Sequence, residues 1–315
     1  MAASSPGSSV RSENKYAIAF LGFGEAASAF RRGFGDRAPA SFRAYDIKTD
    51  TEGPERDGKL AAYEVARVQG CLSRDEALAG ADVVFSMVTA DQALDAARAA
   101  AKHLRADALY LDCNSCAPQT KQKAAGLIEA VGARYVDIAV MAPVYPLLHR
   151  TPLLVSGPHT AAALALAADL ALDAKDAQGE VGRASSIKLV RSIMMKGLEA
   201  LALECVLAGR QLGVDDVVLA SLEQTYPGFG WDGRTGQMLE RAMVHGTRRA
   251  AEMEEAAKMV AELGLPSGMA SATAAWQRQV GALDLKRHPS VSPDAPRTAR
   301  ADAILAALSE RGTKR

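Results

Sequence analysis

The chain has 315 residues, which fits one or two domains, and its 49% hydrophobic content is enough for a packed core. Lys plus Arg and Asp plus Glu each number 37, so the formal net charge is zero. This balance gives no indication of nucleic acid or an anionic membrane as a partner. Four cysteines are too few for a disulfide scaffold of this size, which favours a cytoplasmic protein.

Residues 1–14 are rich in Ser and Ala with scattered charge. They lack the apolar segment of a signal peptide, so we expect a flexible tail. Elsewhere, no apolar run approaches the roughly 18 residues of a membrane helix.

The first expected element is a buried strand over residues 16–21. Gly22, Gly24 and Ala27 follow it with G-x-G-x-x-A spacing and open a helical pattern, which is the layout of a dinucleotide-binding βαβ unit. Gly22 permits the tight turn, and Gly24 lets the backbone approach a pyrophosphate at the helix N-terminus. The residues expected to contact the cofactor here are Gly22, Phe23, Gly24, Glu25 and Ala26.

A second short strand over residues 42–45 ends at Asp46, near the offset expected for the acid that binds a ribose hydroxyl. A carboxylate there repels a 2′-phosphate, which favours NAD over NADP as the cofactor. Arg43 and Lys48 lie close by in the sequence, so NADP stays possible.

Strands and helices then alternate, which predicts a mostly parallel sheet with helices on both faces. Residues 48–58 are expected to form a loop, and Ser73 to begin a short helix through a capping box with Glu76. Asp91 is expected to cap the next helix. The remaining strands are expected over residues 81–88, 108–112, 134–140 and 151–156, with a helix from Pro118.

Strand signals stop near residue 182. Helical patterns follow over residues 186–212, 215–225, 236–263, 268–281 and 298–309. We therefore predict an α/β fold: a doubly wound Rossmann domain over residues 15–183, then an all-helical substrate and dimerisation domain over residues 184–315. Ligand sites favour the cleft at such a junction.

Cys113 and Cys116 form a C-x-x-C pair, which in other contexts is a redox or zinc motif. Zinc needs four ligands, no His lies close on this loop, and Cys71 and Cys205 do not form a second close pair. A redox pair normally opens a helix, whereas Pro118 places the helix start later. We therefore predict no metal.

Position gives this loop a better interpretation. Asp112 ends a predicted parallel strand, and loops at such strand ends face the ligand crevice. We expect Asn114 and Ser115 near the reacting end of the cofactor, and Val88 and Thr89 under the nicotinamide ribose.

Four segments, in this order, resemble the β-hydroxyacid dehydrogenases, the group that holds 3-hydroxyisobutyrate dehydrogenase, tartronate semialdehyde reductase, threonate dehydrogenase and 6-phosphogluconate dehydrogenase. They are Gly22–Gly24 as the cofactor loop, Asp112–Pro118 as D-x-S-[ST]-x-x-P, the stretch from Val136 as D-A-P-V-S-G-G, and Gly182–Lys188 as G-x-G-x-x-x-K. The resemblance covers residues 15–265 and is nearest to a 6-phosphogluconate dehydrogenase-like branch. It implies a long interdomain helix and a homodimer formed through the helical domain.

The substrate side departs from the family pattern. Asn114 replaces the first substrate Ser, Met141–Pro143 replaces the anion-binding S-G-G turn, and Ser192 replaces the Asn four residues after the catalytic Lys. We expect Asn114, Met141 and Pro143 to contact a small-molecule substrate other than 6-phosphogluconate or 3-hydroxyisobutyrate.

Lys188 occupies the position of the family's catalytic lysine, so we expect it to be the general acid/base for the substrate hydroxyl. A free lysine has a pKa of about 10.4 and is a poor base at neutral pH. We expect the helix N-terminal dipole, the charge of Arg191 and burial in a cleft to lower the pKa of Lys188. Ser192, at i+4, faces the same substrate oxygen. Lys196 is the second candidate, with Glu199 as its expected partner at i+3.

His245, Arg248 and Glu252 share one helical stripe. An Arg there can replace the missing turn as carboxylate binder, although a solvated charged face fits the same pattern. Trp231 lies in a loop that either covers the cleft or forms a packed corner.

Three hypotheses follow. The first is an NAD-dependent dehydrogenase of small 3-hydroxy acids or polyol acids. The second is an imine reductase that uses NADPH, since imine reductases share the fold. The third is a cofactor-binding sensor without turnover.

Overall fold

The computed structural model describes residues 15–35 and 40–312, which divide into two compact units. The first unit runs to Val88 and includes residues 92–114 and 119–184. The second comprises residues 89–91, residues 115–118 and the chain from Ser185 onward. The predicted flexible tail, residues 1–14, lies outside the described residues.

Within residues 15–35 and 40–184, eight strands form one sheet in the order β3-β2-β1-β4-β5-β6-β7-β8. Every neighbouring pair is parallel except β6 with β7, so the prediction of a doubly wound, mostly parallel sheet is confirmed. The strands are β1 (Tyr16–Leu21), β2 (Ala40–Tyr45), β3 (Gln69–Gly70), β4 (Val83–Ser86), β5 (Leu109–Asp112), β6 (Arg134–Val140), β7 (Leu153–Ser156) and β8 (Ala174–Asp176).

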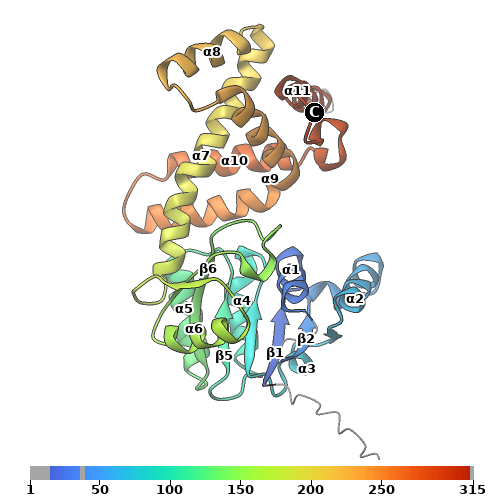
Figure 1. Cartoon of the computed structure of the whole chain (residues 1–315), viewed down its shortest axis with the longest axis vertical. Coiled ribbons are helices and arrows are strands. Elements are labelled where there is room, and N and C mark those ends of the chain that lie inside the picture. The colour runs from blue at the N-terminus through green and yellow to red at the C-terminus, as the bar shows by residue number, and fades with distance from the viewer. Residues whose placement is uncertain (1–14, 36–39, 313–315) are drawn as a thin grey trace, which may run out of the picture. The chain divides into compact units, whose positions relative to one another are not determined.

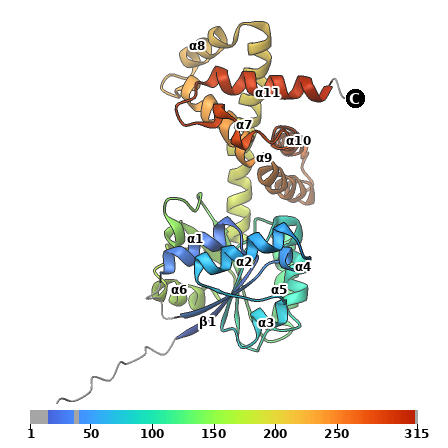
Figure 2. The ribbon, with the colours of Figure 1, turned by 90° about the vertical axis from the view of Figure 1, so that its right-hand side faces the viewer.

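Helices cover both faces of this sheet (Figures 1 and 2). They are α1 (Glu25–Phe34), α2 (Pro54–Ala66), α3 (Arg74–Leu78), α4 (Ala93–Ala100), α5 (Pro118–Glu129) and α6 (Thr160–Asp169). On one face, Phe30 of α1 and Leu166 of α6 join the core around Phe20. On the other face, α3, α4 and α5 pack on Tyr110 and its neighbours. Each face therefore buries its own apolar layer, as a parallel sheet requires.

A buried ionic network links the centre of the sheet to α5. Asp112 and Asp137 are register partners on β5 and β6, and both are buried. The fully buried Lys121 of α5 places its Nζ 2.9 Å from Asp112 Oδ1 and 3.3 Å from Asp137 Oδ1. Burial raises the pKa of the Tyr135 phenol well above its usual range, and this phenol donates to Asp112 Oδ2 at 2.6 Å. Two carboxylates that would otherwise repel are thus held side by side.

The same network reaches β7 and the start of the long helix α7 (Arg183–Leu212). Ser156 Oγ donates to Asp137 Oδ2 at 3.1 Å, and the Gly182 N–H donates to the same oxygen at 3.1 Å. The Ala184 N–H donates to Ser156 Oγ at 3.0 Å. The first residues of α7 are therefore fastened to the sheet.

The second unit is helical. It contains most of α7, followed by α8 (Asp215–Thr225), α9 (Trp231–Glu262), α10 (Gly268–Gly281) and α11 (Arg297–Gly312). Its cores gather around Leu203 and Leu239 in one cluster and around Leu189 and Met253 in another. In the part of the chain that the structure describes, no helix combines the length and the apolar character needed to cross a membrane.

Helices α9 and α10 touch backbone to backbone. A Cβ added at Gly246 of α9 would lie 2.5 Å from the Gln277 carbonyl oxygen, and one added at Gly281 of α10 would lie 2.4 Å from the Thr247 nitrogen. Neither position has room for a side chain, so the crossing depends on both glycines.

Three local predictions were wrong. The expected loop over residues 48–58 contains the start of α2, which has Gly53 as its N-cap and Pro54 as its first residue. Asp91 does not cap α4; it lies in a 3₁₀ turn, and Gln92 is the N-cap. The edge strands β3 and β8 were not predicted, because both are short and carry little apolar sequence.

The buried network predicts a large effect of Lys121→Met. The substitution leaves Asp112 and Asp137 without their cation, so the free energy of unfolding should fall by about 3–5 kcal/mol in urea denaturation. Lys123→Met, an exposed position on the same helix, is the control and should change it by less than about 0.5 kcal/mol. Equal losses in the two variants would contradict the role given to the network.

Candidate functional site

The turn between β1 and α1 has the shape of a dinucleotide loop. Gly22 adopts a φ of +79°, and a Cβ there would lie 2.6 Å from the Met87 carbonyl oxygen, so only glycine fits. A Cβ added at Gly24 would meet no atom within 4 Å. Gly24 is also the N-cap of α1 and offers no side chain to its first N–H groups. The open space beside these groups fits a pyrophosphate.

Asp46 follows β2 and is buried beside this loop. Its Oδ2 accepts a hydrogen bond from the Phe23 N–H at 2.8 Å, and its Oδ1 accepts one from the Lys48 N–H at 3.1 Å. The carboxylate expected to bind a ribose hydroxyl therefore also fixes the peptide between the two glycines. Glu25 and Ala26 open α1 directly after that peptide.

The cation nearest to Asp46 is one that the sequence did not single out. Lys59 of α2 places its Nζ 3.2 Å from Asp46 Oδ2 and donates to the Phe23 carbonyl oxygen at 2.5 Å. The Gly53-Pro54 pair was the signal that could have placed Lys59 on a helix, because Pro is favoured at the first helical position.

Three of the predicted contacts follow the ends of β4 and β5. Val88 is half-buried and Thr89 is exposed. Asn114 is buried, and its Nδ2 donates to Asp112 Oδ1 at 2.7 Å and to Ser86 Oγ at 3.0 Å. Among the described residues, no group donates a hydrogen bond to its buried Oδ1.

In the helical unit, the structure brings Lys188 to Ser115. The Lys188 ammonium donates to Ser115 Oγ at 2.6 Å, and both residues are half-buried. The segment 115–118 is also held by α9, because Glu255 accepts a hydrogen bond from the Ala117 N–H at 2.7 Å. Ser115 was predicted near the cofactor, and here it is the direct partner of the candidate acid/base.

Two of the expected influences on Lys188 are weak. Helix α7 begins at Arg183, so Lys188 is in its second turn, where the terminal dipole has largely decayed. Arg191 is exposed, so water screens its charge.

Lys196 has a different partner from the one predicted. It contacts Glu252 Oε2 of α9 at 2.6 Å, instead of Glu199 on its own helix, and it donates to Ser192 Oγ at 3.1 Å. Glu252 Oε1 in turn accepts a hydrogen bond from Arg248 at 2.5 Å. The stripe on α9 is therefore a buried ionic cluster at Glu252 and not a wholly solvated face.

Burial and neighbouring charges shift the pKa values of Lys196 and Glu252. The pKa of Lys196 lies below its usual value, chiefly because the ammonium is buried, although the carboxylate of Glu252 opposes this effect. Burial opposes ionisation of Glu252, yet the positive charges of Lys196, Arg248 and Lys188 lower its pKa to about 2. Glu252 therefore feels the charge of Lys188 as well.

Glu199 is engaged elsewhere. It is buried, pairs with Arg249, and contacts Arg241 Nη1 at 3.1 Å. His245, one turn before Arg249 on α9, is half-buried. In the first unit, Met141 is half-buried and Pro143 is exposed after β6.

Trp231 does not join Lys188 within this chain. It packs beside the cluster of Leu203 and Leu207, which lies roughly 22–28 Å farther along α7 at 1.5 Å per residue. Its ring lies 4.3 Å from that of Phe229, and its backbone N–H donates to Glu223 Oε2 at 3.0 Å. The loop before Trp231 is therefore a packed corner.

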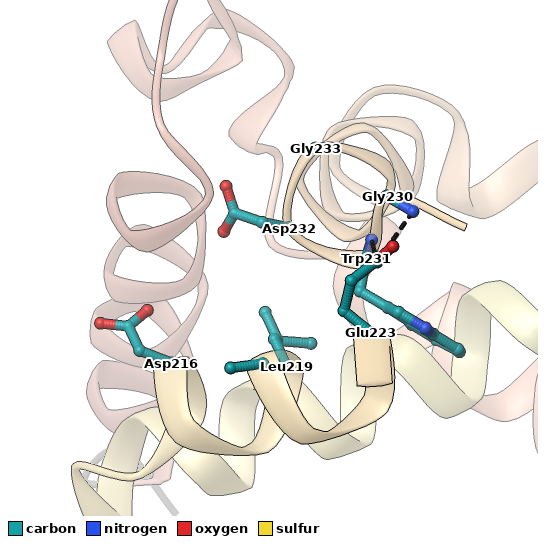
Figure 3. Close-up of a pocket in the computed structure, with 8 residues that line it drawn as sticks. Asp216, Leu219, Glu223, Gly230, Trp231, Asp232 and Gly233 are labelled. Atoms are coloured by element: carbon teal, nitrogen blue, oxygen red, sulfur yellow. Dashed lines mark hydrogen bonds between the residues drawn. The ribbon is translucent and has the colours of Figure 1, made fainter. Parts of the chain in front are cut away.

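This corner borders a cavity of about 410 Å³ between α8 and α9 (Figure 3). Its lining residues are Asp216, Leu219, Ala220, Glu223, Gly230, Trp231, Asp232 and Gly233. Two of the acids, Asp216 and Asp232, are paired with the same arginine, Arg297. Trp231 is the only predicted site residue among the described residues that line it.

The cysteines are all free thiols. Cys113 donates to the Leu111 carbonyl oxygen, and Cys116 donates to that of Ala90. Within residues 15–35 and 40–312, no group of three or more His, Cys, Asp and Glu side chains could hold a metal ion.

Two family models match parts of the chain. The NAD binding domain of 6-phosphogluconate dehydrogenase matches residues 43–167, and a domain of unknown function (DUF1932) matches residues 210–280. The first match supports a nicotinamide cofactor for the first unit.

Solved structures share the fold over most of the chain. A conserved hypothetical protein from Sinorhizobium meliloti is 32% identical, with a TM-score of 0.71, over 94% of this chain and 98% of its own. A conserved protein of unknown function, described as similar to 3-hydroxyacid dehydrogenases, is 28% identical with a TM-score of 0.62, over 84% of this chain and 99% of its own. The Mycobacterium tuberculosis 3-hydroxyisobutyrate dehydrogenase, solved with L-serine, is 16% identical with a TM-score of 0.65, over 92% and 99%. This last similarity shows the fold alone.

The pairing of Glu252 predicts a pH-dependent stability. At pH 7, Glu252→Gln should lower the free energy of unfolding by about 3 kcal/mol, because buried Lys196 loses its counter-charge. The pKa of Glu252 in the folded chain, about 2, lies below its ordinary value of 4.5. The stabilisation is therefore complete above pH 4.5 and is lost as the pH falls toward 2.

Urea unfolding from pH 7 to pH 3 measures this effect. The difference between the wild type and Glu252→Gln should narrow below pH 4.5. Glu262→Gln, an exposed position on the same helix, is the matched control and should show no such trend. A difference that stays constant over the whole range would refute the assigned pairing.

Proposed function

Because the chain belongs to the β-hydroxyacid dehydrogenase superfamily, we propose that it transfers hydride between a nicotinamide cofactor and the carbinol carbon of a small 3-hydroxy acid or polyol acid. The observation that carries this proposal is the 2.6 Å contact of Lys188 with Ser115 in the helical unit. It joins the lysine at the family's catalytic position to the polar loop that follows β5.

In this proposal, Lys188 is the general acid/base. A bound nicotinamide supplies the hydride acceptor or donor. Lys188 takes the proton from the substrate hydroxyl during oxidation and returns it during reduction, which is typically worth about 10²–10⁴ in rate. Ser115 Oγ orients the ammonium, and Ser192 offers a further hydroxyl one turn along the helix.

The charges around Glu252 support an acidic substrate. This carboxylate feels the positive charges of Lys196, Arg248 and Lys188, so the group as a whole has an excess of positive charge. Arg248 is also the most exposed of these cations, with 58% of its side chain accessible. A substrate carboxylate would find its complement there, in place of the S-G-G turn that this chain lacks.

Asp46 supports NAD as the cofactor, since a carboxylate at this position accepts ribose hydroxyls. Gly22, Gly24 and the uncapped start of α1 would hold the pyrophosphate. An imine reductase is the alternative function, and the cationic cluster argues against it because imine substrates carry no obligatory anionic group.

A turnover screen tests the activity. NAD and NADP should each be assayed with hydroxy acids of three to six carbons, with their phosphates and with cyclic imines. Reduction of a nicotinamide by a hydroxy acid supports the proposal. Turnover only with NADPH and imines would replace it with the alternative, and nicotinamide binding without any turnover would favour a sensor.

Lys188→Met tests the mechanism. We expect kcat/KM to fall by about 10²–10⁴, because the proton acceptor is lost, while the dissociation constant for the cofactor changes by less than about twofold. Lys286→Met, an exposed lysine of the same unit, is the matched control and should retain turnover. Retained turnover in Lys188→Met would rule out the assignment.

We also propose that the chain forms a homodimer through its helical unit. Val190, Met194 and Leu201 are 56%, 73% and 54% exposed. They lie on one stripe of α7, since their spacings of four and eleven residues return to the same helical face. Exposed apolar stripes of this kind are typical of interfaces.

Sedimentation velocity tests the dimer. The double variant Met194→Glu with Leu201→Glu should convert a dimer to a monomer, because the buried stripe would gain two charges. Gln211→Glu, exposed on the same helix, should leave the dimer intact. A monomeric wild type at micromolar concentration would contradict the proposal.

A further inference from the structure

The Asp46 carboxylate has a structural task besides any contact with a ribose. One of its oxygens accepts the Phe23 N–H, and the other accepts the Lys48 N–H. Because the residue is 8% exposed, little of this carboxylate faces solvent. Its charge is compensated locally by the ammonium of Lys59, 3.2 Å away.

Lys59 lies beside both Asp46 and the loop of Gly22 to Gly24. It lies in the second turn of α2, and its side chain is 15% exposed. Its ammonium donates to the carbonyl of Phe23, the residue whose N–H is bound by Asp46. These two contacts use two of the three N–H groups of a lysine. The Asp46–Lys59 pair carries no net charge.

The other two cations near Asp46 in the sequence have partners of their own. Arg43 donates to the Ala79 carbonyl oxygen at 2.7 Å. Lys48 places its ammonium 2.7 Å from Glu55 Oε1, at the solvent-exposed side of the loop. Of the three, Lys59 is the cation in contact with the Asp46 carboxylate.

We propose that Lys59 sets the cofactor preference of this chain by binding the 2′-phosphate of NADP, so that the site accepts NADP as well as NAD. This inference rests on the proposed nicotinamide site. An unpaired carboxylate would repel a 2′-phosphate, since like charges at short range oppose binding. Here the ammonium offsets that repulsion and offers a charge-assisted hydrogen bond to the phosphate.

A purely structural role for Lys59 makes a different prediction. If its ammonium only held the Phe23 carbonyl, its loss would distort the glycine loop and weaken every adenine nucleotide alike. The loss of affinity would then be the same with and without the 2′-phosphate. Two nucleotides that differ only in that phosphate separate the two roles.

Calorimetric titration of the full chain with 5′-AMP and with adenosine 2′,5′-bisphosphate provides the test at low ionic strength. In the wild type, we expect the bisphosphate to bind at least as tightly as 5′-AMP. Lys59→Met should weaken binding of the bisphosphate by about tenfold or more, and binding of 5′-AMP by less than about threefold. Lys48→Met is the matched control and should leave the ratio of the two affinities unchanged.

Lys59→Arg keeps the positive charge and should retain most of the affinity for the bisphosphate relative to 5′-AMP. This second variant keeps the test decisive if Lys59→Met fails to fold. Equal weakening of both nucleotides in Lys59→Met, or exclusion of the bisphosphate by the wild type, would overturn this inference alone. Failure of the wild type to bind either nucleotide would overturn the proposed nicotinamide site as well.

Discussion

The placement of one buried lysine between two neighbouring aspartates is the constraint on which the first unit depends. Asp112 and Asp137 are partners in adjacent parallel strands, where two carboxylates would repel strongly in a dry interior. Lys121 makes this pairing tolerable, and Tyr135 and Ser156 donate to the oxygens that remain. Leaving any of these buried groups unpaired would cost free energy, so the contacts fix the register of β5 with β6 and the position of α5 along the two strands. The core of the sheet is thus specified by polar contacts as well as by apolar packing.

Two points of this network lie next in the chain to segments that carry candidate catalytic residues. At one point, Asp112 accepts hydrogen bonds from the backbone and side chain of Asn114, which fixes the end of β5. At the other, Asp137 accepts the Gly182 N–H next to the first residue of α7. The residues that follow these two points are those that the proposed chemistry needs: Ser115 follows Asn114, and α7 carries Lys188. Both segments therefore leave the first unit at residues that hydrogen bonds of this network hold.

The sequence predicted the features whose signals are local. The order of strand, glycines, helix and acid around Asp46 located the βαβ unit, and the superfamily and the fold class are confirmed. The reversed direction of β7 was not predictable, because an apolar run looks the same in either direction. The partner of Lys196 was missed for a related reason: Glu252 lies on another helix, whereas spacing rules reach only a few residues along the same one. Lys59 was missed because its helix was not predicted and the first residues of that helix were assigned to a loop.

The glycine crossing of α9 and α10 limits how this unit can diverge. Since neither Gly246 nor Gly281 has room for a Cβ, α9 cannot slide or roll against α10 without steric overlap at that point. Arg248 and Glu252 follow Gly246 by two and six residues on the same helix, so the crossing sets their positions along α10. New ligand preferences would then arise by exchanging side chains at fixed positions along α9 rather than by moving the helices. Descendants of this chain would keep two bare backbone positions while the chemistry beside them changed.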